Sequence, residues 1–262
     1  MEEKDILAEV VEEVKVENPY KKRVYDFCSS YYILIGCILL GLIILLNFIN
    51  SIMGGIGGIF DFAVGNVFNA LFFAFILKLY LKAKDNGYNL HHEIDSIRTV
   101  VKVHHVFLII GFSFIILGLL ILIPSLSSIM SILSSMMPEY NELMGTVTNT
   151  LLIQALIIVI IEGALIITLF HFILNVLKWT SDAATEIQPK PTKIILVAGI
   201  LAVVYGALSF GYGLFNFIPA TFKLGDASPL INDFSVVSLL ETLLYLYFGI
   251  VLIMFNNKLE SK

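Results

Sequence analysis

The sequence predicts an all-α, polytopic membrane protein: a bundle of six transmembrane helices with both termini in the cytoplasm. Three observations predict this fold class. First, 58% of the 262 residues are apolar and only 14% are charged, too few to cover a water-soluble particle. Second, the chain holds six apolar runs that are long enough to cross a bilayer. Third, its basic residues gather on one side of those runs.

Each apolar run has about 20 residues or more, which is the length that an α-helix needs to cross the hydrocarbon layer. The strands of a membrane β-barrel are shorter and alternate between apolar and polar residues, whereas these runs are continuous. We therefore expect six helices, over residues 32–52, 59–81, 103–124, 151–177, 194–218 and 236–255.

The basic residues predict the orientation, because lysine and arginine accumulate on the cytoplasmic side of membrane helices. All but one of the 16 lysines and arginines lie before the first run, after the last run, or in and next to the second and fourth connections between runs. Only Lys223 falls on the other side. We therefore expect a multi-pass protein of the cell membrane with cytoplasmic N- and C-termini.

The chain is expected to have three parts: a cytoplasmic acidic segment (1–29), the transmembrane domain (30–256) and a cytoplasmic tail (257–262). Apolar residues from Ile6 to Val14 recur at helical spacing among acidic ones, which predicts a short amphipathic helix that Pro19 ends. This helix would suit a cytoplasmic protein partner. The alternative is a solvated, partly ordered tail.

Two connections carry amphipathic patterns. Residues 90–101 predict a helix on the inner membrane surface, which either couples to a cytoplasmic partner or serves as an elbow between spans. Residues 126–137 place leucine, isoleucine and methionine on one face and serine on the other. They predict an outer helix, ended by Pro138, that either lies flat on the bilayer or extends the third span outward.

Glu162 is the main candidate functional residue, because it lies near the middle of the run 151–177. An ionised carboxylate at that depth costs several kcal/mol unless it is paired or hydrated, and such residues often mark ion or proton pathways. We interpret Glu162 as a proton- or ion-responsive group. The alternative is a neutral carboxyl group that forms a hydrogen bond between helices.

Other polar residues inside the runs are secondary candidates. His171 and Asn175 share one face of their helix, about half a turn away from Glu162. Ala198, Ala202 and Gly206 form a small-residue stripe, which predicts close packing against another helix. The residues that could line an outward-facing polar vestibule are Glu241, Asp61, Gln154, Tyr205, Tyr212 and Ser209.

The sequence offers no support for a metal, a cofactor or an enzymatic activity. The pairs His91-His92 and His104-His105 would lie about 20 Å apart along one helix, too far for a single metal ion. The phosphate-binding, serine-hydrolase and zinc-protease motifs are missing from the sequence. The net charge of −5 excludes a basic nucleic-acid-binding protein.

Taken together, these features favour a small transporter or permease-like subunit. The alternative is a non-transporting membrane scaffold, assembly or immunity-type protein, and an intramembrane enzyme ranks third. The expected partners are the lipid bilayer and either a cytoplasmic protein or a separate ATPase subunit, since the sequence has no nucleotide-binding motif of its own.

Overall fold

The computed structural model describes residues 18–53, 58, 62–63, 65–85, 89–136, 141–185, 189, 192–222 and 236–260. Over these residues the chain is all-helical, with seven helices and no strand. The all-helical fold class is therefore confirmed for this part of the chain. The helices are α1 (Pro19–Cys28), α2 (Tyr31–Met53), α4 (Val67–Ala83), α5 (His91–Met136), α6 (Asn141–Ala183), α7 (Ile194–Phe222) and α8 (Val236–Glu260).

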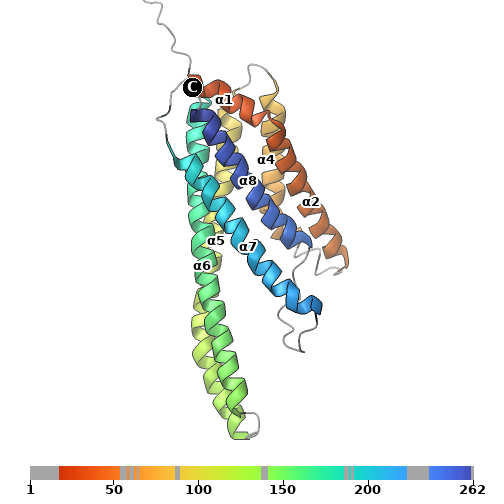
Figure 1. Ribbon diagram of the computed structural model, residues 1–262, viewed down its shortest axis with the longest axis vertical. Helices are drawn as coiled ribbons and strands as arrows, with labels where there is room; N and C mark the ends of the chain where they lie inside the picture. The colour runs from red at the N-terminus through yellow and green to blue at the C-terminus, as the bar shows by residue number, and fades with distance from the viewer. Residues whose placement is uncertain are drawn as a thin grey trace, which may run out of the picture.

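Six of the helices form a closed ring of neighbours. Along the chain α5 contacts α6, α6 contacts α7, and α7 contacts α8. The ring closes because α8 also contacts α2, α2 contacts α4, and α4 contacts α5. The α5–α6 hairpin is the longest part of the molecule and extends past the other helices at the end opposite α1 (Figure 1).

Five of these helices, α2, α5, α6, α7 and α8, are long and apolar enough to cross a membrane. The expected span 59–81 corresponds to α4, which has 17 residues in the described part of the chain. The most apolar stretch of α5 contains no buried residue, although it is the most hydrophobic of all. A helix that is apolar all round and unburied requires lipid around it, so these helices suit an integral membrane protein.

Helix α5 joins the third expected span to the amphipathic segments on both sides of it. It has 46 residues and would measure about 69 Å, more than twice the thickness of the hydrocarbon layer. Residues 91–101 form its first three turns. Residues 126–136 continue it past Pro124, so the second of the two alternatives for this segment, an extension of the third span, agrees with the structure. The hydroxyls of Ser125 and Ser128 donate to the carbonyls of Ile121 and Pro124, at 2.8 and 3.2 Å. Pro124 itself has no N–H and so cannot donate the usual hydrogen bond to the Leu120 carbonyl.

Helix α1 is a feature that the sequence analysis did not identify. Pro19 occupies its first turn and so begins a helix, whereas the amphipathic pattern expected before it lies outside the described residues. The Asn18 side chain caps the helix by accepting a hydrogen bond from the Tyr20 amide at 3.1 Å. Proline suits this position because its missing N–H is not needed there.

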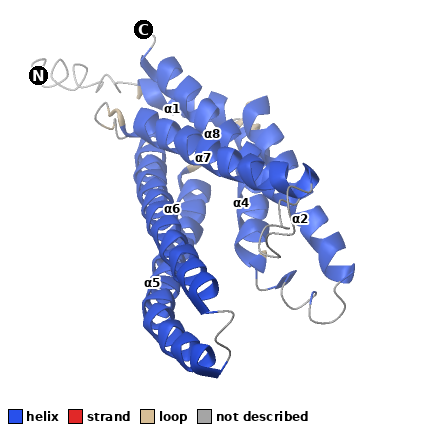
Figure 2. Cartoon of the chain, turned by 60° about the horizontal axis from the view of Figure 1, so that its bottom comes forward, coloured by secondary structure: helices blue, strands red, loops and turns tan. Residues whose placement is uncertain are grey.

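Helix α1 lies across one end of the bundle and contacts α2, α4, α6 and α8 (Figure 2). Asn18 Nδ2 donates to the carbonyls of Ala183 and Thr185 at the end of α6, at 3.1 and 2.9 Å. Arg23 Nη1 donates to the Lys258 carbonyl at the end of α8, at 3.0 Å. These carbonyls lack partners within their own helices, so α1 satisfies groups that would otherwise be exposed or unpaired.

The buried core lies beneath α1. Val24 of α1, Leu90 at the start of α5, Leu169 of α6 and Ile195 of α7 are all 0% exposed. The aromatic rings of α1 continue this packing, because Phe27 stacks on Phe255 of α8 with the ring centroids 4.0 Å apart. Helix α1 therefore packs directly onto the buried core.

Candidate functional site

Glu162 lies on one face of α6. Nearer to α1, the same face of α6 packs against other helices. Ile166 and Leu169 follow Glu162 by four and seven residues, so they share its face, and they are 4% and 0% exposed. Glu162 itself is exposed. This face of α6 is therefore buried near α1 but exposed to the surroundings at Glu162.

Helices α7 and α8 bring further polar groups to Glu162. The Tyr205 phenol of α7 interacts electrostatically with the carboxyl groups of Glu162 and Glu241 and with the Ser209 hydroxyl. Tyr245 of α8 interacts with the same two carboxyl groups. The rings of Tyr205 and Tyr245 pack edge to face, with centroids 4.9 Å apart. We call these five residues the carboxyl–tyrosine cluster.

The spacing along each helix explains how the cluster forms. Tyr205 and Ser209 are four residues apart on α7, and Glu241 and Tyr245 are four apart on α8, so each pair occupies one helix face. The small-residue stripe lies on α7 nearby: Ala198 and Ala202 are 0% and 3% exposed.

The remaining expected vestibule residues are only partly placed. Gln154 is exposed on α6. Asp61 and the side chain of Tyr212 lie outside the described residues. A polar vestibule that includes them stays a prediction.

His171 and Asn175 do not join the carboxyl–tyrosine cluster. His171 follows Glu162 by nine residues, which is about half a turn around α6. Its imidazole is exposed and interacts with that of His105 on α5. The structure thus gives His171 a titratable neighbour on another helix.

His104, beside His105, sits in an aromatic setting. Its ring centroid lies 4.7 Å from that of Phe68 on α4 and 5.0 Å from that of Phe170 on α6. In the described part of the chain its Nδ1 atom is buried without a hydrogen-bond partner. These contacts pack α5 between α4 and α6. Among the described residues, no group of three or more histidine, cysteine, aspartate or glutamate side chains could hold a metal ion.

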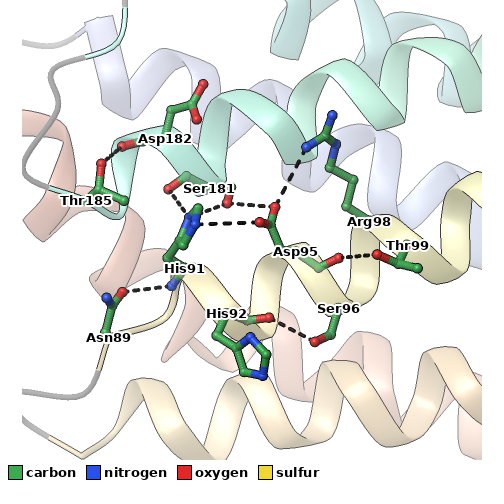
Figure 3. Close-up of polar contacts among 10 residues, drawn as sticks. All are labelled: Asn89, His91, His92, Asp95, Ser96, Arg98, Thr99, Ser181, Asp182 and Thr185. Carbon is green, nitrogen blue, oxygen red and sulfur yellow. Dashed lines mark hydrogen bonds and ion pairs between the residues drawn. The ribbon is translucent and has the colours of Figure 1, made fainter.

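A second polar cluster joins the start of α5 to the end of α6 (Figure 3). Ser181 Oγ lies 2.7 Å from His91 Nδ1 and donates to Asp95 Oδ1 at 3.0 Å. His91 Nε2 lies 3.5 Å from Asp95 Oδ2, and Arg98 Nη1 lies 3.8 Å from Asp95 Oδ1. The sequence analysis missed this cluster. The spacing of His91 and Asp95 was a usable signal, but Ser181 follows His91 by 90 residues.

The second cluster contains the residue types of a serine nucleophile, its base and an acid, but its geometry argues against catalysis. Ser181 is 1% exposed, so a substrate cannot reach its hydroxyl. That hydroxyl also donates to the carboxylate, whereas a nucleophile must pass its proton to the imidazole. The arrangement therefore suits a connection between helices.

Another ion pair missed by the sequence analysis joins α4 to α5. Glu93 is 2% exposed, and its Oε1 lies 3.3 Å from Lys78 Nζ. A buried carboxylate needs such a cation, because an unpaired charge in the interior is costly.

Cys28, at the end of α1, is expected to resist thiol reagents. It is 2% exposed, and burial raises the pKa of its thiol to about 12, so little thiolate forms near pH 8. With Cys37 replaced by serine, maleimide labelling of the native protein should be slow and should become rapid after denaturation in SDS. Equally rapid labelling of both samples would contradict the burial of Cys28.

Comparison with protein-family models, curated proteins and solved structures finds no match for this chain. Its function is therefore argued from the arrangement of its own residues.

Proposed function

We propose that the chain is a multi-pass protein of the cell membrane with both termini in the cytoplasm. Its six spans are α4 and the five longer apolar helices. The two ends of the described chain support an even number of spans. Residue 18 contacts the end of α6, and Arg23 contacts the end of α8, so both ends lie together (Figure 2). The basic residues near this end, including Lys22 and Lys258, support its cytoplasmic location.

Within that membrane domain, the proposed function is that of a small transporter or permease-like subunit. The observation that carries it is the meeting of Glu162 and Glu241, from two different helices, around the Tyr205 phenol. Acidic groups inside a membrane domain usually face a protein interior or a water-filled path and serve ions or protons. A phenol between two carboxyl groups can donate to one of them at a time, which suits the exchange of a proton or a small cation.

The test is proton flux into proteoliposomes that enclose a pH-sensitive dye, driven by a potassium diffusion potential. Glu162→Gln keeps the shape of the side chain but removes its titration, so it should lower the pH-dependent flux by about tenfold or more. Tyr205→Phe should lower it too, because the hydroxyl between the carboxyl groups is lost.

Glu260→Gln is the matched control, since Glu260 is an exposed glutamate at the end of α8. This variant should leave the flux unchanged. A pH-dependent flux that Glu162→Gln does not alter would remove the transport proposal as stated.

The second candidate is a non-transporting scaffold, assembly or immunity-type protein. The observation that favours it is the α5–α6 hairpin, which extends past the other helices and offers a long helical surface (Figure 1). In that case the wild-type protein shows no flux in the same assay, and it co-purifies with a stoichiometric partner after mild detergent extraction. An ATPase subunit that co-purifies with a flux-competent protein would instead support the permease-like function.

A further inference from the structure

Polar side chains follow the line along which α5 and α6 meet, at the end of the hairpin that lies near α1. Because the two helices form a hairpin, residues further along α5 lie beside residues further back on α6. Ser181 Oγ donates to Asp95 Oδ1 at 3.0 Å, and the imidazoles of His105 and His171 interact electrostatically. These two contacts fix the pairing of the helices over three turns.

Six polar residues lie between these two contacts, three on each helix, at helical spacings that place each set on one face. We call them the basic seam: Arg98, Lys102 and His105 of α5, and His171, Asn175 and Lys178 of α6. Glu162 interacts with Tyr205 of α7, and His171 lies about half a turn away from it around α6. The basic seam therefore lies on the outer side of the ring, away from the carboxyl–tyrosine cluster.

The charge of the basic seam is positive. The segments 98–105 and 171–178 contain one arginine, two lysines and no acid. Arg98 lies 3.8 Å from Asp95, one turn nearer the start of α5. Lys102 and Lys178 are exposed, and neither forms an ion pair within the described part of the chain. Two cations on this outer surface thus lack an anionic partner among the described residues.

Exposed apolar residues continue both faces of the basic seam beyond the histidines. Ile109 follows His105 by four residues on α5 and is 40% exposed. Ile160 precedes His171 by three turns on α6 and is 46% exposed. A cationic surface at the edge of an apolar run, followed by exposed apolar surface, matches the two parts of a phospholipid. A soluble anion would match only the first of them.

We propose that the basic seam binds the headgroup of an anionic phospholipid, with Lys102 and Lys178 at its phosphate and the acyl chains along the apolar faces beyond. Lys102 directly precedes the expected span 103–124, and Lys178 directly follows the expected span 151–177, which is the depth of lipid headgroups. Basic residues between membrane helices on the cytoplasmic side recognise such headgroups. The site goes beyond the proposed transport function, since it does not depend on what crosses the membrane.

The test is native mass spectrometry of the full chain in detergent, after incubation with equal amounts of phosphatidylglycerol and phosphatidylcholine that carry the same acyl chains. We expect the wild type to retain the anionic lipid in preference to the zwitterionic one. Each lysine at a membrane surface contributes about fivefold to the binding of anionic lipid. Lys102→Gln or Lys178→Gln should therefore lower the preference about fivefold, and the double variant about 25-fold.

The matched control is a double variant with Lys22→Gln and Lys193→Gln. It removes two exposed lysines from the same end of the bundle, one on α1 and one directly before α7, both outside the basic seam. This variant should keep the lipid preference of the wild type. The two single variants, Lys102→Gln and Lys178→Gln, replace the double variant in the test if the latter fails to fold.

Three results would overturn the lipid site. The first is a wild-type protein that retains both lipids equally. The second is an equal loss of preference in the Lys102/Lys178 and Lys22/Lys193 variants, which would mean that the attraction depends only on net charge. The third is displacement of the retained lipid by excess glycerol phosphate, which would show that the basic seam binds a soluble phosphate without needing acyl chains.

Discussion

Replacing Gly249 with alanine is expected to lower the stability of the bundle by about 3 kcal/mol, the upper end of the usual cost of overpacking. A Cβ atom at this position would lie 2.8 Å from both the Gly199 carbonyl oxygen and the Val203 amide nitrogen of α7. Both atoms belong to the backbone, so they can retreat only if α7 moves away from α8. Unfolding of the protein in mixed micelles, followed by Trp179 fluorescence as SDS is added, measures the effect.

Gly118→Ala is the matched control for this prediction, because a Cβ atom at Gly118 of α5 would meet nothing within 4 Å. Its stability should equal or slightly exceed that of the wild type, since alanine favours helix over glycine. A Gly249→Ala variant as stable as Gly118→Ala would mean that α7 and α8 are not in backbone contact.

Asn18→Ala should produce the second largest loss, about 2 kcal/mol, because it removes two kinds of contact together. Asn18 is 2% exposed. Its Oδ1 caps the start of α1, and its Nδ2 donates to two carbonyls at the end of α6. Without the side chain, those carbonyls stay buried with fewer partners. The same SDS titration, read at Trp179 of α6, measures the change.

Asn18→Ser separates the two contributions, since serine caps a helix well but has no N–H group to donate. It should retain about half of the stability that alanine loses. If serine restored the full stability of the wild type, the contacts with α6 would contribute nothing, and α1 would not fasten the end of that helix.

Most helix positions could be predicted from the sequence, because hydropathy and length are properties of continuous segments. The first expected span, 32–52, differs from α2 by one residue at each end, and α7 and α8 begin at the expected residues 194 and 236. The predictions were weaker where polar residues interrupt the pattern. The segment 90–101 carries charges, which suggested a separate surface helix, but from His91 it is continuous with the rest of α5 because neither glycine nor proline breaks the helix there.

The helix that the sequence analysis missed had a local signal. Asn18-Pro19 is a capping residue followed by proline, the pattern of a helix start. The sequence analysis instead predicted a helix before the proline, over residues that lie outside the described part of the chain. What the sequence did not contain was the role of α1, because α4, α6 and α8, which it contacts, lie far away along the chain.

The candidate site, like the fold, could be predicted from the sequence only in part. Glu162 was identified from its depth in an apolar run, which is a one-dimensional property. Its neighbours Tyr205 and Glu241 were named only as members of a broad polar set, because their meeting depends on the rotation of α7 and α8 about their axes. Ser181 and His91 were not connected at all, since nothing in the sequence relates two residues on different helices.

The sequence by itself determined that this chain is built of apolar helices of membrane-spanning length, because that conclusion needs only the sum of side-chain hydropathies along each segment. Only the tertiary structure decided the order of the helices around the ring and the groups that meet between them. The physical reason is that apolar side chains do not distinguish one neighbour from another. Specific contacts, such as the close approach of the α7 and α8 backbones at Gly199 and Gly249, determine the position and orientation of each helix.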